Sequence, residues 1–313
     1  MENIKLAALV ISEVRKAVIG KDDVLIRVLL AILSRGHVLL EDIPGVGKTT
    51  MALGFSKALD LQFNRVQFTP DVMPSDLTGF SIYNKDTRQM DYQPGALLCN
   101  LFLADELNRA SSRTQSALLE AMEEGQVTVD GITHRIPQPF LVIATQNPSG
   151  ASGTQMLPES QLDRFTLRLS IGYPTMQDEA GMVRRKQDGD PLDTVRRVMT
   201  HADLEQLRCD IEKIYMADEV LDYLLRLIDA TRHNPSILLG ASPRATLALT
   251  AVSRAAAFVK GRDYVIPEDI SSSFYDVIDH RLIYAPNVTS KGQNSPLMEI
   301  LRAVPAPKLR RAP

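Results

Sequence analysis

The sequence predicts an α/β fold, in which a doubly wound parallel sheet is followed by a smaller, C-terminal all-α domain. Short apolar segments alternate with helical patterns up to Tyr173, and strands that alternate with helices form parallel sheets. A glycine-rich loop connects one of these apolar segments to a helix. After Tyr173-Pro174 only helical patterns follow, so we expect domains at 1–173 and 174–304, and a disordered tail at 305–313 that is rich in Pro and Arg.

The α/β part is predicted to hold five strands. The chain opens on an amphipathic helix, because Ile4, Ala8, Ile11, Val14 and Val18 recur at helical spacing. Apolar runs predict strands at 38–40, 63–68, 101–104, 140–145 and 166–171, with helices at about 48–59 and 113–124. Ligands of such sheets bind beyond the carboxyl ends of the strands, so the residues that follow each strand are the candidates for a site.

Two hairpins are predicted to interrupt this alternation. The segments 127–129 and 132–134 flank Asp130-Gly131, a two-residue turn that hairpins favour. A weaker alternating pattern surrounds Asn84-Lys85-Asp86. We therefore expect hairpin inserts near 79–92 and 123–140.

Three helices are predicted in the second part of the chain. An apolar stripe over 220–228 marks the first. Ser242-Pro243 begins another, with Ser as N-cap and Pro at the first helical position. Pro267 begins the third.

The bulk properties place few limits on function. The 313 residues are 44% hydrophobic and carry a net charge of −3, which gives no sign of a polyanion partner, although a basic pore could lie inside an acidic molecule. Cys99 and Cys209 lack disulfide or metal spacing, which fits a reducing, cytoplasmic location. We expect neither a signal peptide nor a membrane span, because charges interrupt the apolar runs and no run approaches roughly 20 residues.

A phosphate-binding loop is predicted between the strand at 38–40 and the helix that begins at Lys48. The Gly47-Lys48-Thr49 core stands in the strand–loop–helix context that a P-loop needs. Gly45 and Gly47 let backbone N–H groups approach phosphate oxygens, and the helix start adds its positive dipole end. Lys48 would reach the β- and γ-phosphates of ATP, and Thr49 would bind Mg²⁺. Asp42 replaces the first glycine of the motif, and the alternative is a glycine-rich turn with a surface lysine.

Polar residues also follow two further strands. Asp105 would hold the water shell of Mg²⁺, and Glu106 would act as general base toward the attacking water. Strands often run into acidic loops, so the prediction of a catalytic role for this pair depends on the P-loop upstream. Asn147 could hydrogen-bond the attacking water or the γ-phosphate; the alternative is a turn asparagine before Pro148.

In their order along the chain, these motifs resemble those of MoxR-type AAA+ ATPases. The resemblance covers nearly the whole chain, and Asp42 is itself common in that family. The matching segments are 40–49, 68–71, 74–79, 103–110, 114–122, 144–148, 157–165 and 240–245, which read LEDIPGVGKT, FTPD, PSDLTG, LADELNRA, TQSALLEAM, ATQNP, LPESQLDRF and GASPRA.

The resemblance implies a P-loop NTPase sheet of the AAA+ type with a helical lid, and a role for each motif. Asp105 and Glu106 would form Walker B, Asn147 sensor 1, Arg164 the arginine finger and Arg244 sensor 2. The hairpins would face the pore of a ring. Residues near the adenine would be Val18, Ile19 and Gly20, and the ATP-binding loop would comprise Pro44, Gly45, Val46, Gly47, Lys48, Thr49 and Thr50.

Two of these roles have support from the residues themselves. Arg164 lies between the apolar anchors Leu162 and Phe165, where its guanidinium could reach the γ-phosphate of a neighbouring subunit. The alternative is a surface salt bridge with Asp163. Arg244 falls in the first turn of its helix, where a cation opposes the dipole, so bound ATP or a salt-bridge partner should hold it. Arg109 could also reach a neighbouring subunit.

The leading interpretation is an ATP-hydrolysing ring of identical subunits, hexameric by resemblance, that remodels, matures or activates client proteins as a chaperone. Partners with von Willebrand factor A domains are typical of the family, and here such a partner would be a separate chain. A nucleic-acid motor or loader is the second interpretation, although the mixed charges of the hairpin tips, Lys85, Asp86 and Asp130, suit phosphates poorly. A small-molecule kinase, which needs no arginine from a second subunit, is the third.

Overall fold

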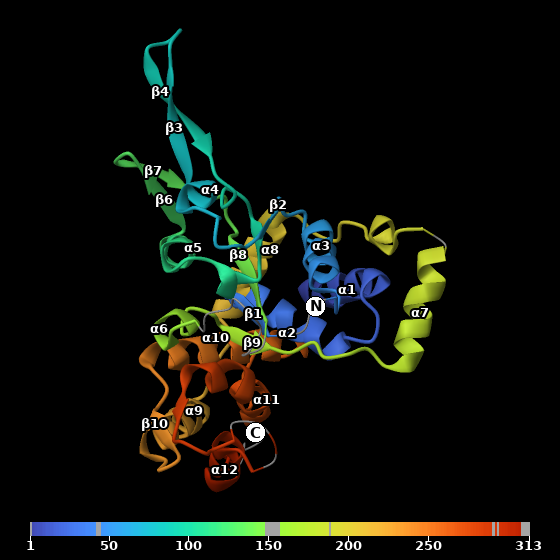
Figure 1. The fold of residues 1–313 in the computed structure, drawn as a ribbon. Helices are drawn as coiled ribbons and strands as arrows, with labels where there is room; N and C mark the ends of the chain where they lie inside the picture. The colour runs from blue at the N-terminus through green and yellow to red at the C-terminus, as the bar shows by residue number, and fades with distance from the viewer. Residues whose placement is uncertain are drawn as a thin grey trace.

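The computed structural model describes residues 2–41, 45–147, 157–187, 189–289, 292 and 294–307. Its centre is a parallel sheet with the strand order β2-β5-β8-β1-β9 (Figure 1). The strands are β1 (Val38–Glu41), β2 (Phe63–Gln67), β5 (Leu101–Asp105), β8 (Leu141–Gln146) and β9 (Leu167–Leu169). All five lie within two residues of the segments that the sequence predicts, which confirms the doubly wound parallel sheet.

Alternate residues of the strands pack on opposite faces of the sheet. Val38 and Leu40 of β1 belong to an apolar cluster with helices α1 (Glu2–Ala17), α2 (Asp22–Leu33) and α3 (Lys48–Ala58). Leu39 belongs to a second cluster with α5 (Ser112–Glu124) on the other face. Because both faces are covered, the inner strands β1, β5 and β8 are apolar up to their carboxyl ends, whereas the edge strands β2 and β9 also carry Asn64, Arg65 and Arg168.

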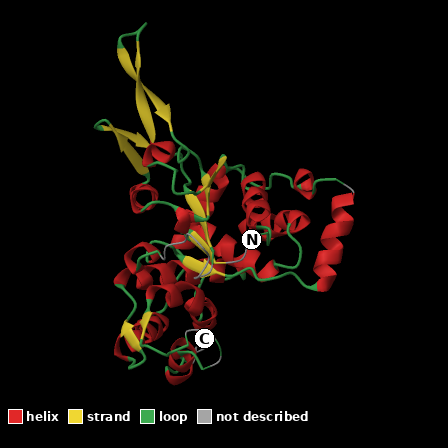
Figure 2. Ribbon diagram, in the orientation of Figure 1, coloured by secondary structure: helices red, strands yellow, loops and turns green. Residues whose placement is uncertain are grey.

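Two antiparallel hairpins project from the α5 side of the molecule (Figures 1 and 2). The longer joins β3 (Gly79–Asn84) to β4 (Gln89–Pro94) and follows α4 (Pro74–Thr78), and the shorter joins β6 (Gln126–Val129) to β7 (Ile132–Arg135). The rings of Tyr92 and His134 stack with centroids 3.6 Å apart, and this contact ties one hairpin to the other.

The second part of the chain is mainly helical. Ser242 caps its longest helix by accepting a hydrogen bond from the Ala245 N–H at 3.2 Å. Residues 237–239 and 283–284 pair as two short strands, which the sequence pattern does not predict. The elements are α7 (Met176–Gln187), η2 (Pro191–Thr194), α8 (His201–Glu212), α9 (Asp218–His233), β10 (Ile237–Leu239), α10 (Pro243–Val259), α11 (Pro267–Ile278), η3 (Asp279–Arg281), β11 (Ile283–Tyr284) and α12 (Pro296–Ala303).

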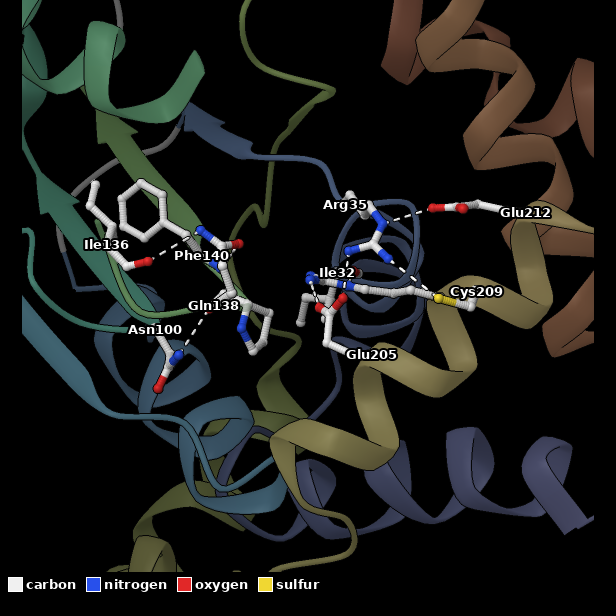
Figure 3. Close-up of polar contacts among 11 residues, drawn as sticks. Ile32, Arg35, Asn100, Ile136, Gln138, Phe140, Glu205, Cys209 and Glu212 are labelled. Atoms are coloured by element: carbon white, nitrogen blue, oxygen red, sulfur yellow. Dashed lines mark hydrogen bonds and ion pairs between the residues drawn. The ribbon is translucent and has the colours of Figure 1, made fainter. Parts of the chain in front are cut away.

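Helix α8 packs back onto the α/β part. Arg35, just beyond α2, forms ion pairs of 2.6 and 2.8 Å with Glu205 and Glu212 of α8 (Figure 3). In the reverse sense, the buried Arg208 of α8 donates to the Ile32 carbonyl of α2. The apolar cluster around α1 to α3 also continues into α8, α10 and α11. The helical part is thus fixed to the α/β part.

Residues 308–313 of the predicted tail lie outside the described residues. In the part of the chain that the structure covers, every helix is too short or too polar to cross a membrane.

Candidate active site

The loop before α3 has the backbone that phosphate binding requires. Gly45 and Gly47 have φ values of 86° and 93°, a region that side-chain-bearing residues rarely adopt. An added Cβ at either glycine would meet no atom within 4 Å, so the space over the loop is open. Lys48 begins α3 and is buried, and Gly47, as its N-cap, leaves the first N–H groups of the helix without a side-chain cap. Pro44 lies outside the described residues.

The register of the sheet brings the predicted acidic residues beside this loop. Strand β8 lies between β5 and β1, so the ends of β5 and β1 are about 10 Å apart. Thr145 of β8 pairs with Leu40 of β1, and its hydroxyl donates to Asp105 Oδ1 at 2.7 Å. The same hydroxyl accepts the backbone N–H of Glu106 at 2.8 Å. Thr145 therefore fixes both acidic residues relative to the sheet.

Glu106 and Asn147 lie within hydrogen-bond distance of each other. The Asn147 side chain donates to Glu106 Oε1 at 3.3 Å, and Arg109 of η1 (Leu107–Arg109) pairs with Oε2 at 2.8 Å. This arginine contact lowers the pKa of Glu106 below its usual value, so the carboxyl stays ionised at neutral pH. Glu106 also has a φ of 58°, a strained backbone of the kind that clusters at functional sites.

A cleft of about 750 Å³ runs from the loop toward the first helix. The cleft is lined by Val18 and Ile19 and by Gly45, Val46, Gly47 and Thr50, so two of the predicted adenine residues and four of the predicted loop residues share it. The volume lies in the range of small-molecule sites, roughly 300–1,000 Å³. Gly20 follows Ile19 with a φ of 70°, and a Cβ there would come within 2.2 Å of the Asp178 carboxyl.

Lys21 lines the cleft and holds one of the segments beside it, a role that sequence reasoning missed. Its buried ammonium donates to the carbonyls of Ile171, Gly172 and Tyr173 at 2.8, 3.1 and 2.8 Å. These three residues connect β9 to α7, which supplies Met182 and Arg185 to the same cleft. Nothing in the local sequence marks Lys21, because its partners lie about 150 residues away.

Arg164 and Arg244 lie together on one carboxylate. Arg164 follows α6 (Glu159–Leu162) and pairs with Glu123 Oε2, and Arg244 at the start of α10 pairs with Glu123 Oε1, both at 2.5 Å. Arg164 also donates to the Leu119 carbonyl at 2.7 Å. The anion that holds Arg244 in this structure is thus Glu123, and Asp163 pairs with Arg281 instead of Arg164. Neither arginine lines the cleft over Gly45–Gly47.

The donor set fits Mg²⁺ as well as phosphate. Thr49 and Asp105 offer the hydroxyl and carboxylate oxygens that Mg²⁺ prefers, and Mg²⁺ is usually bound by one or two carboxylates together with phosphates. Within the described residues, no group of three or more His, Cys, Asp or Glu side chains forms a separate metal centre. Asp105 Oδ2 accepts from Arg65 at 2.7 Å, so this ion pair occupies one of the candidate ligand oxygens.

Comparisons with known sequences identify the family of each part of the chain. Residues 37–167 match the profile of the ATPase family associated with various cellular activities (AAA), and residues 229–300 match that of the AAA lid domain. The first match covers four of the five strands of the sheet and the first residue of β9, the loop before α3 and both acidic residues. The second covers the helices from the end of α9 to α12.

Individual relatives narrow the family further. YeaC of Bacillus subtilis (strain 168) is 43% identical over 304 residues, which are 96% of this chain and 95% of that protein. Chaperone MoxR1 of Mycobacterium tuberculosis is 39% identical over 282 residues, 87% of this chain and 74% of its own. The crystal structure of a candidate ATPase from Cytophaga hutchinsonii superposes with a TM-score of 0.90 at 37% identity, covering 98% of this chain and 96% of that one. The chain belongs to the MoxR family of AAA+ ATPases.

Proposed function

We propose that this protein hydrolyses ATP in a ring of identical subunits and uses the energy to remodel or activate client proteins. The observation that carries the proposal is the meeting of Glu106 and Asn147 beside the glycine loop, with Asp105 fixed next to them by Thr145. These groups have the geometry to bind a triphosphate and activate a water.

The residues divide the work of hydrolysis between them. The N–H groups at the start of α3 and the Lys48 ammonium bind the phosphate oxygens and offset their charge. Glu106 accepts the proton of the attacking water, and Asn147 orients that water through its amide. Thr49 and Asp105 would hold Mg²⁺, which, when bound, supplies further neutralisation of the phosphate charge.

Arg164 and Arg244 complete the site of the neighbouring subunit in this proposal. Two arginines on one exposed glutamate form a cationic group on the surface, and 30% and 44% of their side chains are exposed. Their own loop already has Lys48 and the start of α3, whereas a γ-phosphate presented by a neighbour would compete with Glu123 for both guanidinium groups. Exchange of that surface ion pair for the phosphate costs little, because exposed ion pairs contribute about 0–1 kcal/mol.

The chaperone role rests on the relative that is named a chaperone and on the projecting hairpins. The tips and sides of the hairpins expose large apolar residues: Phe80, Ile82, Tyr83, Met90 and Ile132. Exposed apolar groups on a projecting hairpin suit contact with another protein better than contact with a phosphate backbone. A separate partner with a von Willebrand factor A domain, six subunits per ring and a cytoplasmic site of action belong to the same proposal.

Replacing Lys48 with alanine should weaken ATP binding about 10- to 100-fold, because charge-assisted hydrogen bonds to phosphate contribute about 1.5–3 kcal/mol. Fluorescence titration with a labelled ATP analogue measures the change directly. Lys213→Ala is the matched control, because Lys213 lies at the exposed end of α8. Unchanged affinity in Lys48→Ala, with a folded protein, would contradict binding at this loop.

A further inference from the structure

The short segment that carries Arg164 is held from the lid by buried polar contacts. Residues 163–166 lead from α6 into β9 and form no strand of their own. Across from them lies η3, the turn between α11 and β11. Two of the three residues of η3, His280 and Arg281, bind carbonyl or carboxylate groups on both sides of Arg164.

Arg281 makes most of these contacts. Its guanidinium pairs with Asp163 Oδ1 at 2.8 Å and donates to the carbonyls of Asp163, Phe165 and Thr166 at 3.2, 2.7 and 3.2 Å. Only 2% of its side chain is exposed. Burial lowers the pKa of Arg281 to about 10, so the side chain keeps its charge at neutral pH. One rigid fork of donors thus fixes the backbone on both sides of Arg164.

His280 holds the same backbone through a second donor. Its Nε2 lies 2.9 Å from the Phe165 carbonyl, which can only accept, so Nε2 carries the proton. Burial lowers the pKa of His280 well below its usual value, and the ring is therefore neutral. The residues immediately before and after Arg164 are therefore both bound to η3.

Other contacts fix η3 and Asp163 in turn. Asp279, the first residue of η3, forms an ion pair with Arg168 of β9 and accepts from the Tyr284 hydroxyl at 2.7 Å. Asp163 accepts from the hydroxyl of Ser242, the N-cap of α10, at 3.1 Å. Arg244 follows two residues later on the same helix. The lid therefore determines where both surface arginines lie.

We propose that Arg281, assisted by His280, is a positioning residue for the arginine finger: it holds residues 163–166 so that Arg164 reaches the neighbouring subunit's ATP. The inference rests on the proposed shared site. Arg281 itself touches no substrate, and it acts only through the backbone and Asp163. If Arg281 only stabilised the lid, its loss would lower ATP turnover in its own subunit's site at least as much as in the neighbouring subunit's site.

The test is the ATP turnover of the assembled protein with Arg281→Lys. Lysine keeps the charge but cannot reach Asp163 and the three carbonyls together. A displacement of about 1 Å can lower a rate about 100-fold, so we expect kcat to fall about 10- to 100-fold, with the KM for ATP changed less than about twofold because the variant's own loop is intact. Arg262→Lys is the matched control, since Arg262 pairs with the buried Asp269 elsewhere in the lid.

Mixed assemblies separate positioning from a general structural defect. Arg281→Lys subunits have an intact Glu106, so turnover should return when they are mixed with Glu106→Gln subunits, which supply a well-placed Arg164. Mixing with Arg164→Ala subunits should restore nothing. If Arg281→Lys subunits do not assemble, Asp163→Asn, whose side chain is 22% exposed, carries the same expectations.

Two results would overturn the inference. One is a kcat for Arg281→Lys within twofold of the unaltered protein. The other is a low kcat that Glu106→Gln subunits do not rescue, which would place the defect in the variant's own site or in assembly. Full turnover by Arg164→Ala would instead contradict the proposed shared site itself. Failure of the shared site can therefore be distinguished from failure of the role proposed for Arg281.

Discussion

Arg164→Ala should lower the ATP turnover of the assembled protein by about 10³-fold or more, the lower end of the range known for arginine fingers. The physical reason is charge: as the γ-phosphoryl group leaves, its oxygens gain negative charge that water solvates poorly in a closed interface. In this structure 30% of the Arg164 side chain is exposed, and its guanidinium is held by Glu123 and the Leu119 carbonyl. Steady-state phosphate release measures the loss.

The affinity of Arg164→Ala for ATP separates a finger from an ordinary binding residue. A finger acts mainly in the transition state, so the affinity should change less than about tenfold while kcat falls far more. Arg226→Ala is the control, because Arg226 forms an exposed ion pair with Asp222 on the lid surface. Rescue by Glu106→Gln subunits is expected, and its absence at every mixing ratio would count against a site shared between subunits.

The sheet and the loop could be predicted because their signals are local. Buried strands such as β5 and β8 are continuous apolar runs. Residue 39 faces one core and residues 38 and 40 face the other, which follows from the two-residue period of a strand alone. Helix α8 also has a local signal in the sequence, since Thr200 and Asp203 form a capping box at its start. The β10–β11 pair had none, because two very short strands pair across more than 40 residues.

The candidate site divides in the same way. The residues that follow strands, Asp105, Glu106 and Asn147, could be found because parallel strands end at one edge of a sheet. The partner of Arg244 could not be predicted, since Glu123 lies 121 residues earlier in the chain. Its carboxylate is the anion that offsets the charge of Arg244 at the start of α10. Arg109, which could also reach a neighbouring subunit, pairs in this structure with Glu106 three residues before it. Residue type and position after a strand thus predict the candidate reactive groups, whereas their ion-pair partners depend on contacts between residues far apart in the sequence.

Glu106→Gln should lower hydrolysis about 10²- to 10⁴-fold, the usual contribution of a general base, while ATP binding is retained. Glutamine can still accept from Asn147 at the oxygen of its amide, so the geometry of the site changes little, but the amide cannot take a proton from water. Its loss of charge also releases Arg109, whose ion pair with Glu106 is 2.8 Å long. Single-turnover hydrolysis of bound ATP is the measurement, and Glu219→Gln, at the exposed start of α9, is the control.

The structure also predicts what Arg109 does to this base. Arg109 donates to Glu106 Oε2 and Asn147 donates to Oε1, so an attacking water approaches oxygens that each already accept one hydrogen bond, and Arg109 also lowers the basicity of the carboxylate. Arg109→Ala should therefore leave Glu106 ionised and freer, with turnover equal to or above that of the unaltered protein. A loss as large as that of Glu106→Gln would show that Arg109 is needed for the reaction itself, and ordinary turnover by Glu106→Gln would exclude Glu106 as the base.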